Sequence, residues 1–130
     1  MIALDTNILL RLVAGDDHAQ ERAVLRLLAK GDTDYFIGDV TLAEFVWTLS
    51  SIYRYTPEEL VIAVEALLSR ADIQFEDRLR IRRAVKHLAD GGDFADLLIL
   101  ARAEAEGCTA LASFDKGLKK KFPNFVVVPS

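Results

Sequence analysis

The segment Ile2-Ala3-Leu4-Asp5-Thr6-Asn7 joins a short apolar run to three residues that favour the first position of a helix. Asp, Thr and Asn side chains accept hydrogen bonds from the free backbone N–H groups of a helix N-terminus. Apolar residues then recur at helical spacing between positions 8 and 13. The segment therefore predicts a strand that turns directly into a helix, the unit from which α/β folds with parallel strands are built.

The same alternation of short apolar runs and longer helical patterns continues to the end of the chain. Further strands are predicted at 35–37, 73–75, 108–112 and 125–128. Further helices are predicted at 17–29, 41–53, 57–70, 77–88 and 93–106. No repeat or linker-like tract divides residues 1–130, so we expect a single domain, an α/β sandwich with a mainly parallel central sheet.

Composition excludes several classes of protein. Hydrophobic residues make up 52% of the 130 residues, with only 3 Pro and 7 Gly, which excludes disordered and collagen-like chains. The single cysteine, Cys108, is expected to be a small buried residue. One cysteine cannot form an internal disulfide or, with two scattered histidines, a zinc site, which favours a reducing, cytoplasmic location. No signal peptide or membrane span is predicted. The net charge of −4 argues against a protein that coats polyanions.

Acidic residues follow the predicted strands repeatedly. Asp5 comes directly after the first strand, Glu44 lies near the start of the helix after the second, and Asp115 follows the strand at 108–112. The carboxyl ends of parallel strands share one edge of a sheet, and ligands bind outside that edge. Asp96 lies near the start of another helix, one helical turn after Asp93, but its spacing alone does not place it at that edge.

Each of these acids also has a simpler interpretation. Asp5 and Asp93 fit ordinary helix N-caps, Glu44 fits a capping box with Thr41, and Asp115 fits a strand end. Carboxylates that met within about 4 Å would repel by about 4 kcal/mol per pair at an effective dielectric near 20, a cost that caps avoid. A cation would offset this cost, and carboxylates without His or Cys suit Mg²⁺ or Mn²⁺.

The chain resembles the PIN domain family in four motifs. In order they are Leu4-Asp5-Thr6-Asn7, Leu42-Ala43-Glu44-Phe45-Val46-Trp47, Asp93-Phe94-Ala95-Asp96 and Ser113-Phe114-Asp115. Each motif is common by itself, but four in order over essentially the whole chain are specific. The resemblance is closest to the VapC-like ribonuclease toxins of toxin–antitoxin pairs, which are single PIN domains of about this length.

This resemblance implies a three-layer α/β/α fold and a metal-dependent endoribonuclease. The residues that hold Mg²⁺ or Mn²⁺ and carry catalysis would be Asp5, Glu44, Asp96 and Asp115. The polar groups around them would be Thr6, Asn7, Asp93 and Ser113. A metal-activated water would hydrolyse RNA phosphodiesters and leave 5′-phosphate and 3′-hydroxyl ends. Toxins of this kind are commonly homodimers and are neutralised by a small antitoxin protein that covers the active-site groove.

Basic residues that could contact RNA phosphates occur in two places. The candidates are Lys116, Lys119 and Lys120 after the last acid, and Arg78 and Arg82 on the helix at 77–88. A solvated, charged surface is the alternative interpretation of both groups. Apolar residues around most of the helix at 57–70 fit either an internal core or a contact with a second copy or an antitoxin.

Two other functions stay open at this stage. The chain could be a phosphoryl-transfer or phosphoacceptor domain with Asp5 as its nucleophile, although Asp5-Thr6-Asn7 lacks the second acid that those patterns need. It could also be a non-catalytic nucleic-acid-binding module that uses its basic residues. Such a module has no need for four acids, so the nuclease is favoured.

Overall fold

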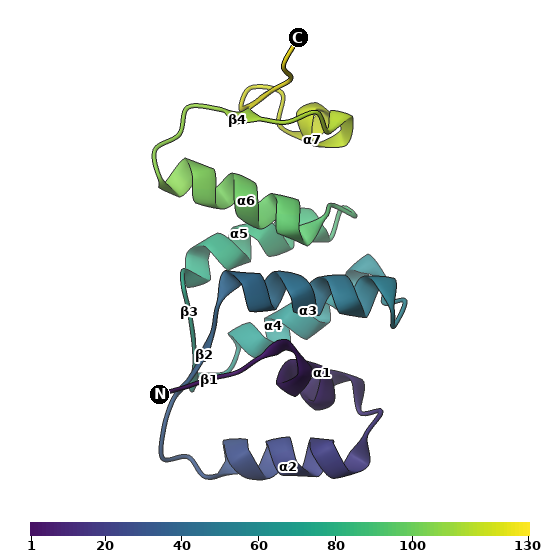
Figure 1. The fold of residues 1–130 in the computed structure, drawn as a ribbon, viewed down its shortest axis with the longest axis vertical. Coiled ribbons are helices and arrows are strands. Elements are labelled where there is room, and N and C mark those ends of the chain that lie inside the picture. The colour runs from purple at the N-terminus through teal and green to yellow at the C-terminus, as the bar shows by residue number, and fades with distance from the viewer.

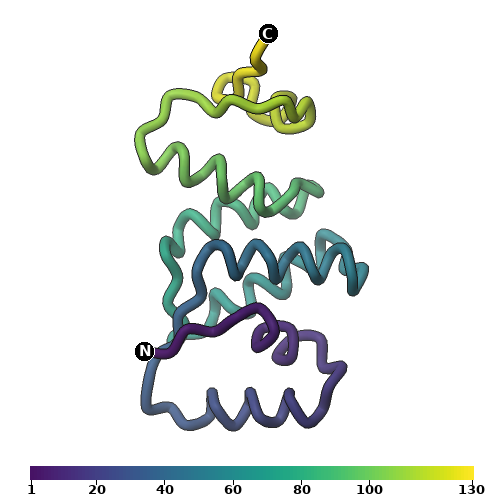
Figure 2. Tube along the Cα trace, viewed as in Figure 1, coloured from purple at the N-terminus to yellow at the C-terminus, as the bar shows by residue number.

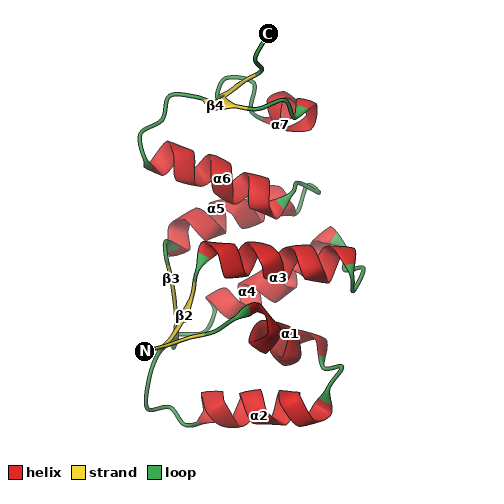
Figure 3. Cartoon of the chain, viewed as in Figure 1, coloured by secondary structure: helices red, strands yellow, loops and turns green.

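The computed structural model describes residues 1–130, in which helices and short strands alternate (Figures 1 and 3). The strands are β1 (Ile2–Ala3), β2 (Tyr35–Ile37), β3 (Ile73–Phe75), β4 (Leu111–Ala112) and β5 (Val126–Val127). The helices are α1 (Thr6–Ala14), α2 (His18–Ala29), α3 (Asp39–Ser51), α4 (Pro57–Leu68), α5 (Arg78–Leu88), α6 (Phe94–Ala105) and α7 (Lys116–Lys121). This order confirms the predicted α/β class.

The five strands form two separate parallel sheets. The first has the order β1-β2-β3, with Ile2 beside Tyr35 and Tyr35 beside Ile73. The second contains β4 and β5, with Leu111 beside Val126. The prediction of parallel pairing is thus confirmed, and the strands that follow α6 pair with each other rather than with β1.

The elements are stacked along the long axis of the molecule (Figures 1 and 2). Helix α2 lies at one end, and β4, α7 and the C-terminus lie at the other, with α3 and α6 between them. Helix α3 packs against α1, α4 and α6, and α6 packs against α5 as well. The first sheet and the second are therefore separated by helices.

Two groups of buried apolar residues correspond to these two parts. The main core surrounds α3, whose Leu42, Phe45 and Leu49 have no exposed surface. A small second cluster contains Leu100, Leu118 and Val126 and holds β4, α7 and β5 against α6. We call residues 107–130 the C-terminal unit, because its buried residues Leu118 and Val126 belong to this second cluster, while Phe122 packs against both clusters.

Most helix ends lie where the local sequence predicts them. The Asp17 carboxylate accepts from the Gln20 N–H, and Thr56 and Glu59 form a complete capping box at the start of α4. Helix α1 ends at Gly15, whose φ of 64° is in the left-handed region that favours glycine. These interactions lie within a few residues of sequence, which is why the pattern predicts them.

Three local predictions were wrong. Helix α3 begins at Asp39 with Gly38 as its cap, so Glu44 lies in the second turn and forms no capping box with Thr41. The lysine-rich segment after Asp115, for which no helix is predicted, forms α7. The fourth strand begins only at Leu111, so Cys108 lies in the turn after α6 and is exposed rather than buried.

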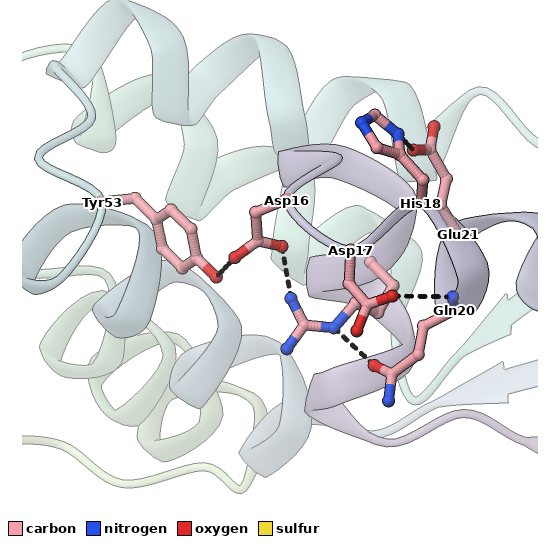
Figure 4. A network of polar contacts seen from close by, with 7 residues as sticks. Asp16, Asp17, His18, Gln20, Glu21 and Tyr53 are labelled. Atoms are coloured by element: carbon pink, nitrogen blue, oxygen red, sulfur yellow. Dashed lines mark hydrogen bonds and ion pairs between the residues drawn. The ribbon is translucent and has the colours of Figure 1, made fainter.

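A polar network joins the α1–α2 corner to the end of α3 (Figure 4). The Tyr53 hydroxyl donates to Asp16 Oδ2 at 2.7 Å, and the Arg11 guanidinium donates to Asp16 and to Gln20. The hydrogen bond from Tyr53, followed by that from Arg11, lowers the pKa of the Asp16 carboxyl. This network fixes the angle at which the two helices leave the corner.

An ion pair joins α5 to the start of α3. Arg80 Nη2 lies 2.6 Å from Asp39 Oδ2, and these side chains are 6% and 18% exposed. Arg80 Nη1 also lies 3.5 Å from Asp77 Oδ2. Asp39 Oδ1 and Arg80 Nε have no hydrogen-bond partner, so the charges depend mainly on one another. The pair sets the position of α3 and hence of Glu44.

Candidate active site

Three of the predicted acids meet in one pocket between α6 and α7. Asp93, Asp96 and Asp115 line it, together with the backbone of the Gly91-Gly92 turn. Asp93 is the N-cap of α6 and Asp115 is the N-cap of α7, so two helix N-termini point their free N–H groups toward the pocket. The pocket thus collects carboxylates where helix dipoles favour negative charge.

Hydrogen bonds fix two of the three carboxylates. Asp93 Oδ1 accepts from the Asp96 N–H at 3.0 Å, and Asp115 Oδ1 accepts from the Leu118 N–H at 2.9 Å. The Asp115 N–H donates to Ser113 Oγ at 3.0 Å, so Ser113 orients the turn that carries Asp115. The capping interpretation of Asp93 is therefore confirmed, and Asp115 also proves to be a cap.

The Asp96 carboxyl differs from its neighbours because it accepts no hydrogen bond within the protein. Partial burial raises the pKa of Asp96, and the negative charges of Asp93 and Asp115 raise it further. Its ionised form is therefore disfavoured in the folded protein. A proton or a bound cation would relieve this repulsion, which makes Asp96 the residue most prepared to bind a positive ligand.

Lys121, which belongs to the basic run that follows the last acid, also lines this pocket. A Cβ on Gly92 would lie 2.9 Å from Lys121 Nζ and 3.3 Å from Leu97 Cδ1, so glycine leaves room for the lysine at the rim. Lys121 is the last residue of α7, the helix that Asp115 caps. Its charge partly offsets that of the three acids.

Asp5 and Glu44 do not line this pocket. Asp5 is exposed at the end of β1 and caps α1, its Oδ1 accepting from the Ile8 N–H at 3.2 Å. Thr6 is buried and Asn7 is exposed in the first turn of α1. The Glu44 side chain is exposed on α3 and makes no hydrogen bond. The structure therefore divides the predicted acids into two sets.

This division has a direct cause in the sheet topology. Asp115 would reach the edge that carries Asp5 only if β4 joined the sheet of β1, and β4 pairs with β5 alone. No group of three or more His, Cys, Asp or Glu side chains is placed so that it could hold a metal ion. The oxygen donors of the pocket suit Mg²⁺ or Mn²⁺ in kind, but within one copy they form only part of a coordination shell.

The predicted phosphate contacts differ in whether their charged groups already bind other groups of the protein. Lys116 and Lys120 are exposed on α7, whereas Lys119 Nζ donates to the carbonyls of Pro123 and Val126. The Arg78 guanidinium donates to the carbonyls of Leu68 and Ile73 and lies 4.9 Å from the Phe75 ring centroid. Arg82 is exposed on α5, beside Glu65 and Lys86. Lys116 and Lys120, which follow the pocket directly, are best placed for a polyanion.

Four parallel strands that each lead into a helix, and carboxylates gathered at helix N-termini, define the class: an α/β protein with an acidic site. Residues 2–121 match the model of the PIN domain family, so the chain belongs to that family. It is also similar to the VapC ribonuclease of Aquifex aeolicus (strain VF5), with 27% identity over 123 residues that cover 92% of this chain and 91% of the relative. None of the helices combines the length and the apolar character needed to cross a membrane.

Proposed function

We propose that this protein is an Mg²⁺- or Mn²⁺-dependent endoribonuclease. The observation that carries the proposal is the acidic pocket, in which Asp96 is half-buried, accepts no hydrogen bond and has a raised pKa beside Asp93 and Asp115. Perturbed carboxyl groups in a pocket are typical of functional sites. Membership of the PIN domain family and similarity to a VapC ribonuclease support an RNA substrate.

The residues of the pocket that would hold the ion are Asp96 and Asp115, whereas Asp5 and Glu44, the other two acids that the family resemblance implies, lie outside the pocket within one copy. A bound divalent ion supplies a water of lowered pKa and a positive charge for the phosphoryl group. The protein's own groups position the carboxylate and the substrate. Ser113 and the α7 N-terminus fix Asp115, and Lys116 and Lys120 hold phosphates beside it. We infer that cleavage leaves 5′-phosphate and 3′-hydroxyl ends.

We further propose that the nuclease is the toxin of a toxin–antitoxin pair and acts on cytoplasmic RNA. Its partner would be a small antitoxin protein. Large apolar side chains are exposed beside the site, with Trp47 58% exposed on α3 and Ile99 55% exposed on α6. Together with Val40 and Leu98 they border apolar hollows between these two helices, which suit the helix or tail of a protein partner.

The test is cleavage of a mixed RNA by the purified protein, with Mg²⁺, with Mn²⁺ and with EDTA. We expect cleavage only with a divalent ion, and loss of at least a hundredfold in Asp96→Asn. Asp90→Asn is the matched control, because Asp90 is an exposed acid in the turn before Gly91 and does not line the pocket. Sequencing of the ends then reports their chemistry.

Two results would contradict the proposal. Cleavage that persists in EDTA would exclude the metal requirement. A phosphoryl group found covalently on Asp5 after incubation with a small phosphodonor, without RNA cleavage, would instead support a phosphoacceptor domain.

A further inference from the structure

The outer edge of β1 has no partner. The N–H groups of Ile2 and Leu4 donate to the carbonyls of Asp34 and Phe36 at 3.0 and 2.9 Å. Because successive residues of a strand alternate in direction, the backbone N–H and C=O of Ala3 point to the opposite edge, where no strand lies. Ile2 is 44% exposed and Ala3 is exposed. The unpaired N–H and C=O of this edge are available to pair with another strand.

The outer edge of β4 has no partner either. The N–H groups of Leu111 and Ser113 donate to the carbonyls of Phe125 and Val127 at 2.9 and 3.0 Å. Ala112 lies between them, is exposed, and presents its N–H and C=O to the free side. The other edges of the two sheets, at β3 and β5, are also unpaired, but β1 and β4 are the edge strands followed by the acids Asp5 and Asp115.

Within one copy these edges lie apart. Figure 1 shows α3 and α6 between β1 and β4. Helix α6 is anchored in the main core by Phe94, Leu97 and Leu98, and residues 106–110 that lead from it to β4 span at most about 18 Å when fully extended. The C-terminal unit is thus held beside α6, and the free edge of β1 is open to another chain.

The two edges also differ in charge. The C-terminal unit contains four lysines and one aspartate, whereas the first 60 residues contain 10 acidic and 5 basic side chains. Asp5 follows β1 at its carboxyl end, and Lys116 follows β4 and Asp115 at the corresponding end. Parallel pairing of the edges would therefore bring the basic unit of one copy to the acidic part of another.

We propose that two copies of this chain pair reciprocally, β1 of each beside β4 of the other, so that each active site is shared between copies. The free edges of β1 and β4 are then filled by one two-fold arrangement, and each new sheet has the order β3-β2-β1-β4-β5. Asp5 and Glu44 of one copy face Asp96 and Asp115 of the other. The shared site rests on the proposed function, whereas the pairing of strands rests on the edges alone.

A cross-linking experiment tests the pairing without reference to activity. In a Cys108→Ser background, chains with Ala3→Cys are mixed with chains that carry either Leu111→Cys or Ser113→Cys and are oxidised. In a parallel pair, a residue that bonds toward the neighbouring strand lies opposite one that bonds away from it, as Ile2 lies opposite Tyr35. Adjacent strands lie about 4.8 Å apart, within the range of Cα separations that a disulfide spans. We expect a covalent dimer in one of the two mixtures, according to the register of the strands, and none from any variant alone, since no position faces its own copy. Absence of the dimer from both mixtures would overturn the proposal.

The double variant, with both cysteines of the linked pair in one chain, distinguishes a second copy from closure within the chain. Linked dimers are expected by gel electrophoresis without reductant. A fast-migrating monomer with an internal disulfide, together with a monomeric mass in solution, would overturn the shared arrangement.

Mixed dimers then test whether the site is shared. Chains with Asp5→Asn and Asp96→Asn, carrying different tags, are co-expressed and purified through both tags. One of the two sites in each mixed dimer is intact, so about half of the wild-type RNA cleavage is expected. The matched control pairs Asp5→Asn with Glu44→Gln, which leaves no intact site. Recovery equal to that of the control would overturn the sharing. Cross-linking without any wild-type cleavage would contradict the proposed function and leave the strand pairing supported.

Discussion

Replacement of Asp39 by alanine should remove a large part of the protein's stability. The change leaves the Arg80 guanidinium, only 6% exposed, with Asp77 Oδ2 at 3.5 Å as its remaining acidic neighbour. Breaking a buried ion pair by deletion of one partner costs about 3–5 kcal/mol, because the other charge stays buried and uncompensated. A domain of this size has a total stability of about 5–15 kcal/mol, so the loss should be easy to measure.

The assay is urea unfolding followed by circular dichroism, with the free energy extrapolated to water. We expect a lower midpoint with an unchanged slope, since the same surface is exposed on unfolding. The double variant Asp39→Leu with Arg80→Met should be closer to wild type than either single change, because apolar replacements of a buried pair are often neutral or stabilising. Moderate salt should alter these differences little, as buried charges are weakly screened.

A loss below about 1 kcal/mol would refute this reasoning. That value is typical of a solvent-exposed pair and would mean that water reaches the Arg80 guanidinium. A double variant less stable than both single variants would refute it too. If the pair does hold α3 in place, Asp39→Ala should also reduce RNA cleavage, because Glu44 is carried on the same helix.

Three other predictions follow from the site and the C-terminal unit. Asp96→Asn should raise the melting temperature in EDTA at neutral pH, because the pKa of Asp96 is raised in the folded protein and its ionisation therefore costs stability. This gain should vanish as the pH falls through the folded-state pKa toward the unfolded-state pKa. An unchanged gain at low pH would contradict the prediction. Leu118→Ala should lower the free energy of unfolding by about 2–5 kcal/mol and speed hydrogen exchange at the Leu111 amide, while the amides of α3 stay protected. Uniform acceleration over the whole chain would show that the C-terminal unit does not open separately. Lys120→Ala should weaken RNA binding measured by fluorescence anisotropy and reduce the salt slope by about 0.7, whereas Lys30→Ala on the distant end of α2 should not; equal effects would place RNA elsewhere.

Interactions that are local in sequence were predicted well. The capping box of Thr56 and Glu59, the Asp17 cap and the strand at 35–37 each depend on a few neighbouring residues. Helix α7 was missed because only Leu118 is buried in it, so its lysines show no apolar periodicity. Cys108 was misplaced because an apolar run does not mark the residue at which strand pairing begins.

Contacts between distant residues could not be predicted in the same way. Asp39 and Arg80 are 41 positions apart, and Asp16 and Tyr53 are 37 apart, so neither pair leaves a local pattern. The grouping of Asp96 with Asp115 depends on how α6 and α7 pack, and their separation from Asp5 depends on which strand lies beside β4. Sequence identified the acids as residues that follow strands or begin helices, but strand order decides which of them meet.

The placement of Asp5 and Asp115 on separate sheets bears on how the protein would behave at low abundance. If each working site draws its carboxylates from two molecules, the number of sites grows with the square of the protein concentration while most molecules are still single. A cell that makes a few copies would then degrade almost no RNA, and a modest rise in synthesis would produce a disproportionate rise in damage.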